Sequence, residues 1–283
     1  MSAEPCIAAK LAADVARILD KAEVPNVLFG LLAVGLIAVD LGVGEADFVV
    51  RDDDLHSAVN ALRATGFPLC EESDCRELKE DRYDPTINKG KGYWTSDALY
   101  GIVAENRYHA IAKVHFHLES FGYPDCTLLS LFTQTKLLWA FPDLILDPPT
   151  ADDRVFWLSN DPRLPPPRKP GRPGACGPWT KLHPVRILSP VSLSEALILL
   201  FAQNYGHDKS VDIAWRDMFS MVVDEGETNR VLNPKYQRVW NSFKGIGPPG
   251  ENVHISVRHL KEQLIAEGSL KEIPPCNNIK WLH

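Results

Sequence analysis

The order of apolar and polar residues between positions 26 and 67 predicts several secondary-structure elements in quick succession. Residues 26–29 form a short apolar run that ends at Gly30, and residues 31–41 are apolar enough for a buried helix. Residues 45–50 alternate and then become apolar, which predicts a strand. A second helix then runs toward residue 67. The segment therefore predicts a strand, a glycine turn, a helix, a strand and a helix.

Two acidic residues lie on the strand predicted at residues 45–50. Side chains at positions i and i+2 of a strand project from the same face, so Glu45 and Asp47 are expected side by side, about 7 Å apart along the chain. Two such carboxylates can bind a hard cation such as Mg²⁺, which prefers oxygen ligands and usually keeps waters and substrate phosphates. The alternative is a solvated strand end, in which an aspartate of the run 52–54 caps the next helix.

This order of elements resembles the core of the nucleotidyltransferase fold, the DNA polymerase β superfamily, and is similar to divergent, uncharacterised fungal members of it. In that family a Gly-Gly or Gly-Ser turn precedes a helix, and the next strand carries Asp-x-Asp or Asp-x-Glu. The matching residues here are Phe29-Gly30 and Glu45-x-Asp47, so Phe29 and Glu45 each replace a family residue. The resemblance covers residues 24–120 and extends weakly beyond them.

The resemblance implies an α/β (α+β) fold, with a nucleotidyltransferase-like mixed sheet, flanking helices and a C-terminal helical domain. It also implies that Glu45 and Asp47 are catalytic residues that bind Mg²⁺ and that Gly30 contributes to substrate binding.

A further strand is predicted at residues 112–119. Alternation places apolar side chains on one face and His115, His117 and Glu119 on the other. In the family a third carboxylate lies on a later strand, and here His115 or His117 stands in its place. A histidine can bind a transition metal or act as a base near neutral pH, but it is a poor Mg²⁺ ligand. Both are candidate catalytic residues, and the alternative is that both are ordinary residues of a half-exposed strand.

Residues 161–186 carry six basic residues and one acidic residue, against a net charge of −7 for the whole chain. The segment is also rich in proline and glycine, which excludes a helix or a central strand. One interpretation is a flexible flap that closes on the phosphates of a nucleotide or a tRNA, with Arg168, Arg172 and Lys181 binding substrate and Trp179 available to stack on a base. The alternative is a solvated linker.

A second candidate for phosphate binding is the alternation of lysine and glycine at residues 88–94. Its candidate substrate-binding residues are Lys89 and Lys91. The segment does not match a P-loop, which needs a Gly-x-x-x-x-Gly-Lys-Ser/Thr sequence before a helix.

The last third of the chain predicts helices at residues 192–206, 211–223, 233–243 and 253–267. Ser192 and Glu195 have the spacing of a capping box, and Gly206 suits a C-terminal stop. We expect a nucleotidyltransferase-like domain at residues 1–158, a basic linker or flap at residues 159–187 and a helical domain at residues 188–283.

The composition, with 45% hydrophobic residues and a mean hydropathy of −0.14, is typical of a soluble globular protein. No uncharged apolar run reaches the ~18 residues of a membrane span, and residues 1–21 have amphipathic spacing, not a secretory pattern. The six cysteines include no Cys-x-x-Cys pair and are too sparse for a disulfide framework. We expect a reduced, cytoplasmic protein with no membrane association and no disulfide-linked partner.

These observations predict a transferase that acts on a phosphate-bearing substrate. The resemblance implies that this is nucleotidyl transfer, in which Mg²⁺ held by Glu45 and Asp47 neutralises charge on a triphosphate while an acceptor hydroxyl attacks the α-phosphorus. The first alternative is metal-independent acyl or aminoacyl transfer from a tRNA or a coenzyme, as in fungal cyclodipeptide synthesis in specialised metabolism, with His115 or His117 as the base. The second alternative is a non-catalytic binding module.

Overall fold

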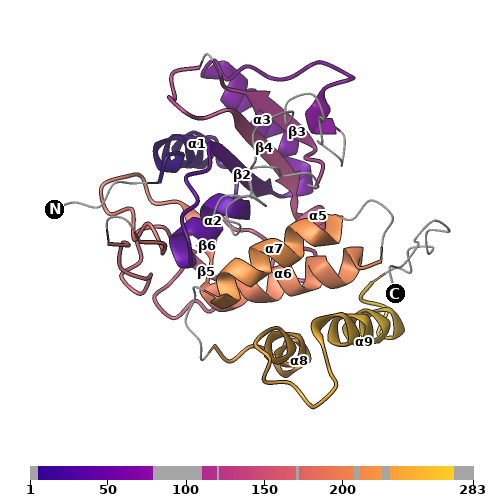
Figure 1. Cartoon of the computed structure of the whole chain (residues 1–283). Coiled ribbons are helices and arrows are strands. Elements are labelled where there is room, and N and C mark those ends of the chain that lie inside the picture. Colours follow the sequence, from indigo (N-terminus) through magenta and orange to yellow (C-terminus); the bar gives the residue numbers. More distant parts are fainter. Residues whose placement is uncertain are drawn as a thin grey trace, which may run out of the picture.

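The computed structural model describes residues 6–78, 110–119, 121–169, 172–206, 211–224 and 230–270. In this part of the chain a six-stranded mixed sheet is surrounded by helices (Figure 1), which confirms the expected mixed α/β class with C-terminal helices. The strands are β1 Asn26–Phe29, β2 Glu45–Val50, β3 Val114–His117, β4 Leu128–Thr133, β5 Phe156–Leu158 and β6 Arg186–Leu188. The helices are α1 Ala9–Lys21, α2 Gly30–Ile37, α3 Leu55–Ala64, α5 Gln134–Leu137, α6 Pro190–Asn204, α7 Val211–Asp224, α8 Pro234–Phe243 and α9 Val253–Ala266, with 3₁₀ turns η1 Asp52–Asp54 and η2 Arg76–Leu78.

The strands are ordered β3-β4-β2-β1-β6-β5 across the sheet. The central strand β2 runs antiparallel to β1 and parallel to β4, and β4 runs antiparallel to the edge strand β3. In this register Phe29 lies opposite Asp47, Asp47 opposite Ser130, and Ser130 opposite His115. Residues directly opposite each other on paired strands share a face. These four side chains therefore form one row across one face of the sheet.

The strand beside β2 is β4, which the sequence analysis did not identify. All but the last of its residues are buried, so its sequence lacks the alternation that marks a half-exposed strand. The strand predicted at residues 112–119 is β3, which is shorter than predicted. It pairs with β4 at the edge of the sheet and does not pair with β2. The neighbour of Asp47 on the next strand is consequently Ser130, not a histidine.

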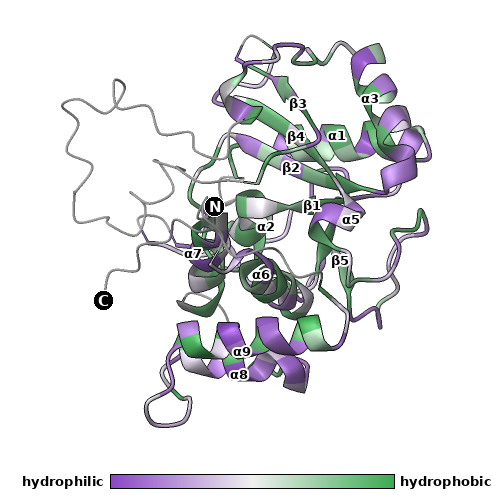
Figure 2. Ribbon diagram, turned by 90° about the vertical axis from the view of Figure 1, so that its right-hand side faces the viewer, coloured by the Kyte–Doolittle hydropathy of each residue, from purple (hydrophilic) through white to green (hydrophobic). Residues whose placement is uncertain are grey.

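The helices form layers around the sheet, and one hydrophobic core runs through both. Helix α1 packs against α3 and β1, while α2 packs against β2 and α7. Helix α6 packs along α7, and α8 and α9 form a pair that packs on α6 away from the sheet (Figure 1). Figure 2 shows many hydrophilic residues on α3, α8 and α9, as expected for outer helices.

The start of α6 differs from the prediction. Ser189, not Ser192, is the N-cap: its hydroxyl accepts a hydrogen bond from the Ser192 N–H at 3.2 Å, and Pro190 occupies the first turn. The expected capping box at Ser192 is therefore wrong. Glu195 instead accepts the backbone N–H of Asn233 at 2.7 Å, which links α6 to the start of α8.

A disulfide joins Cys6 to Cys176, across a sequence separation of 170 residues. The expectation of fully reduced cysteines is wrong here, because a pairing over this distance leaves no spacing pattern in the sequence. The segment around Cys176 also forms backbone hydrogen bonds with α2 and the residues after it. Cys176 N–H donates to the Gly35 carbonyl at 3.0 Å, and Asp40 N–H donates to the Gly174 carbonyl at 3.0 Å. Helix α2 accordingly ends at Ile37, earlier than predicted.

The expected border between the linker and the helical domain falls inside β6, which pairs with β1 in the middle of the sheet. The predicted border thus cuts through a strand of the sheet and does not separate two units. A membrane-spanning helix is not found in the described part of the chain, because none of its helices combines sufficient length with sufficient apolarity.

Candidate functional site

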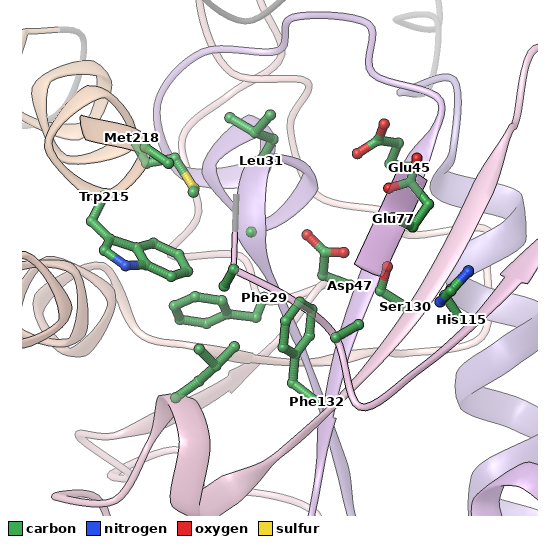
Figure 3. Close-up of a pocket in the computed structure, with 15 residues that line it drawn as sticks. Phe29, Leu31, Glu45, Asp47, Glu77, His115, Ser130, Phe132, Trp215 and Met218 are labelled. Atoms are coloured by element: carbon green, nitrogen blue, oxygen red, sulfur yellow. The ribbon is translucent and has the colours of Figure 1, made fainter. Parts of the chain in front are cut away.

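A pocket opens where the start of α2, the sheet face and α7 meet (Figure 3). It contains about 680 Å³ of space between atoms, part of it open solvent. Its lining residues are Phe29, Gly30, Leu31, Glu45, Asp47, Glu77, Ala110, Ala112, His115, Ser130, Phe132, Leu137, Ala214, Trp215 and Met218.

Among the described residues, three that line this pocket carry a carboxylate. Glu45 and Asp47 come from β2, and both are half-buried while Ala46 and Phe48 between and beside them are fully buried. The strand alternation therefore turns both acidic side chains into the pocket and the apolar ones into the core. The third carboxylate is Glu77 of the turn η2, which the sequence analysis missed because no periodic pattern surrounds it.

Gly30 approaches Asp47 very closely. A Cβ atom at Gly30 would lie 2.3 Å from Asp47 Oδ2, which no side chain can tolerate without displacing the carboxylate. Gly30 also has φ +70, a conformation that favours glycine. This residue starts α2 and lines the pocket, so the N-terminal end of the helix lies beside the carboxylate of Asp47.

The opposite wall is apolar and fixed by packing. The rings of Phe29 and Trp215 lie 6.3 Å apart in an edge-to-face arrangement, and Met218 lies beside them (Figure 3). Trp215 Nε1 donates to Asn204 Oδ1 at 2.8 Å, which holds the indole between α6 and α7. The pocket thus combines a carboxylate-rich side with an aromatic side.

Of the described residues that line the pocket, none is a lysine or an arginine. The predicted substrate-binding residues Arg168, Arg172 and Lys181 are not among them. Arg168 instead binds Asp40, with its Nη2 3.3 Å from the Asp40 carboxylate and its Nη1 donating to the Asp40 carbonyl at 2.6 Å. Arg172 and Lys181 are exposed.

Trp179 is only 4% exposed and its Nε1 contacts Cys176 Sγ at 3.4 Å, so the expectation that it is free to stack on a base is wrong. Lys89 and Lys91 lie outside the described residues.

A second group of polar side chains lies on the same face of the sheet. Cys70, Cys75, His115 and His117 each direct one ligand atom to a common point, and these four atoms lie within 4.8 Å of one another. The sequence analysis named both histidines as catalytic candidates but did not connect them with the cysteines. A Cys-x₄-Cys segment and a His-x-His strand were the available signals, but about forty residues separate them, and only the fold brings them together.

No protein-family model, no curated protein and no solved structure matches the chain. The site must therefore be interpreted from its own chemistry.

Proposed function

We propose that the chain is a nucleotidyltransferase-like transferase, and that its pocket binds Mg²⁺ and a phosphate-bearing substrate through Glu45 and Asp47. The observation that supports this most is the contact between Gly30 and Asp47. A glycine that opens a helix against the acidic residue of the next strand is the arrangement expected from the family that the sequence resembles. Glu45 lines the same pocket two residues before Asp47.

The donor set fits Mg²⁺. Among the described residues, the cysteine and histidine group is the one set of three or more candidate metal ligands whose ligand atoms lie close together. The three pocket carboxylates do not form such a set, so their oxygen atoms are farther apart. Two carboxylates are sufficient for Mg²⁺, because it is usually bound by one or two of them together with waters and substrate phosphates. When bound, the ion would neutralise negative charge on the transferred phosphate group.

The charge of the pocket supports a cation-dependent substrate. Three of the described lining residues, Glu45, Asp47 and Glu77, carry a carboxylate, and carboxylates attract a cation. We therefore expect a phosphate-bearing substrate to bind there together with Mg²⁺.

The chain's own residues then have separate roles. The first N–H groups of α2 donate to phosphate oxygens beside Gly30. The rings of Phe29 and Trp215 bind the apolar part of the substrate and exclude water from that side. Glu77 accepts the proton of the acceptor hydroxyl. The hydroxyl oxygen forms a bond to the α-phosphorus while the bond to the pyrophosphate group breaks, and pyrophosphate leaves.

The test is a transfer assay on the full chain. Purified protein is incubated with each α-labelled nucleoside triphosphate and a pool of hydroxyl-bearing acceptors, including tRNA, with and without added Mg²⁺. We expect pyrophosphate release and labelled product only with Mg²⁺, and loss of both in Glu45→Gln. Asp53→Asn removes an exposed carboxylate outside the pocket and should remain active. Equal product from Glu45→Gln and the unmodified chain would reject the proposal.

Metal-independent acyl or aminoacyl transfer is the second candidate, because His115 lines the same pocket and an imidazole can act as a base. This candidate predicts acyl transfer from aminoacyl-tRNA without added Mg²⁺ and its loss in His115→Ala. Omission of Mg²⁺ is preferable to a chelator in this comparison, because a chelator also removes softer metal ions.

A further inference from the structure

We propose that Cys70, Cys75, His115 and His117 bind one Zn²⁺ ion in a closed structural site, referred to below as the zinc cluster. It is separate from the Mg²⁺ site of the proposed function and does not depend on it. Two cysteines with two histidines are a common ligand set of tetrahedral structural zinc.

The distances suit zinc. All four ligand atoms lie within 4.8 Å of one another, and Cys75 Sγ is 3.3 Å from His117 Nε2. Bond lengths of about 2.3 Å to sulfur and about 2.0–2.1 Å to nitrogen place tetrahedral ligands roughly 3.3–3.8 Å apart. The cluster therefore needs a contraction of about 1.5 Å at most, which rotations of the four side chains would supply.

The backbone holds the two ligand segments together. His115 and His117 project from one face of β3, because they are two residues apart on a strand. The preceding segment runs along the outer edge of β3: Leu69 pairs with Phe116, and Cys70 N–H donates to the His115 carbonyl at 3.1 Å. After Cys75 the chain turns, with Leu78 N–H donating to the Cys75 carbonyl at 3.0 Å. Both cysteines are thus fixed beside the histidines by main-chain contacts.

The orientation of His117 also suits metal binding. Its Nε2 faces Cys75 Sγ, while its Nδ1 lies 3.8 Å from Glu119 Oε1. Metal-binding histidines usually direct their second nitrogen to a carboxylate or carbonyl, which fixes the tautomer that leaves the other nitrogen for the metal. The separation of 3.8 Å exceeds a hydrogen bond, and a rotation of the exposed Glu119 side chain would bring its carboxylate to Nδ1.

The burial of the four side chains and their sulfur and nitrogen donors favour zinc as the metal and a structural role for it. Cys75 and His115 are 6% and 4% exposed, and Cys70 and His117 are half-buried. Two thiolates balance the charge of a divalent ion, so the site can be buried without net charge. Sulfur and imidazole ligands favour zinc over magnesium, and four protein ligands leave no open position for a substrate. The role is therefore structural.

The zinc cluster lies next to the candidate pocket. His115 lines the pocket, and Glu77 follows Cys75 by two residues. Zinc would hold the 70–78 segment on the edge of the sheet and thereby fix the third carboxylate of the pocket. As a metal ligand, His115 would not be available as a base.

The first measurement is metal content. The full chain is produced in zinc-supplemented medium, purified without chelator, and analysed by mass spectrometry for bound metals. We expect one zinc per chain, lost in Cys75→Ser and in Cys70→Ser. Cys126→Ser is the matched control, because Cys126 is a buried free cysteine outside the cluster, and it should keep its zinc. Zinc retained at full occupancy in both cluster variants would overturn the proposal.

The second measurement keeps the test valid if a cluster variant fails to fold. Metal-free unmodified chain is titrated with Co²⁺, whose visible absorption is strong in tetrahedral sites and whose thiolate ligands add a near-ultraviolet charge-transfer band. We expect both signals to saturate at one equivalent and to disappear when Zn²⁺ is added. Glu119→Gln should weaken metal binding by about 10–100-fold and leave the spectrum unchanged. Absence of both bands, or a Cys70–Cys75 disulfide in peptide mapping of freshly purified protein, would contradict zinc binding.

Discussion

The acidic pocket and the zinc cluster share one face of one sheet, and His115 belongs to both, yet their donor atoms are of opposite kinds. The pocket offers carboxylate oxygens and remains open on one side. The cluster offers two sulfur and two nitrogen atoms and is closed. Hard and soft ligands select different metals, so neighbouring sites can hold different ions without exchange. Our two proposals together assign one metal to the edge of the sheet and another to the adjacent pocket.

The strongest way to separate the two sites is a single substitution in the pocket. Asp47→Asn keeps the shape of the side chain but removes the charge that binds the cation, so transfer activity should fall by about 10³-fold or more. The zinc content should remain at one per chain. Activity assays and metal analysis on the same preparation check this. Loss of zinc in Asp47→Asn would mean that the two sites are a single unit.

The next effect is expected from Gly30→Ala. The added methyl group would lie 2.3 Å from Asp47 Oδ2 and displace that carboxylate, so activity should fall by about 10²-fold, as for a misplaced catalytic group. Gly66→Ala is the matched control, because Gly66 also has a positive φ, of +94, but its nearest atom would be 3.5 Å away on Phe121. Both variants should lose about 1 kcal/mol of stability in denaturant titrations. Equal activity in the two would contradict the role of the Gly30–Asp47 contact.

The two sites also differ in how far the sequence reveals them. Glu45 and Asp47 are two residues apart, so strand periodicity is enough to put them on one face. The zinc cluster needs Cys70 and Cys75 to meet a strand about forty residues later. That meeting depends on the pairing of Leu69 with Phe116, which no local pattern encodes.

The fold, too, could be predicted from the sequence only where an element has a local periodic pattern. The predicted helices at residues 211–223, 233–243 and 253–267 match α7, α8 and α9 closely, because each has an amphipathic pattern. The strand β4 is buried on both faces and gave no such pattern. The amphipathic spacing of residues 1–21 does not extend to Ile7, which lies before α1 and is 46% exposed.

The disulfide sharpens the distinction among the cysteines. Cys6 and Cys176 close a long loop, and their replacement by alanine in a double variant should lower the free energy of unfolding by about 3 kcal/mol. Zinc content and transfer activity at low temperature should not change, because the zinc cluster uses other cysteines. Thermal unfolding with parallel metal analysis is the measurement. Loss of zinc in the double variant would show that Cys6 or Cys176 supports the cluster.

The smallest effect is expected at the basic segment. Arg168 binds Asp40, which is only 6% exposed, so Arg168→Ala should lower stability by about 1 kcal/mol and leave the KM for the nucleotide unchanged. Lys181→Ala, at an exposed position of the same segment, should change neither. Steady-state kinetics is the measurement. A KM for the nucleotide raised at least tenfold in both variants would contradict this expectation and support a flap that binds phosphates.

The central claim is that Asp47 and its pocket use Mg²⁺ while the neighbouring cluster keeps zinc. Its most direct test is a Mg²⁺ titration of transfer activity with zinc-loaded protein, in the unmodified chain and in Asp47→Asn. We predict activity that rises from zero to saturation with Mg²⁺ in the unmodified chain, no activity in Asp47→Asn, and one zinc per chain in both throughout. Full activity of the zinc-loaded chain without Mg²⁺, or an unchanged titration in Asp47→Asn, would contradict the claim.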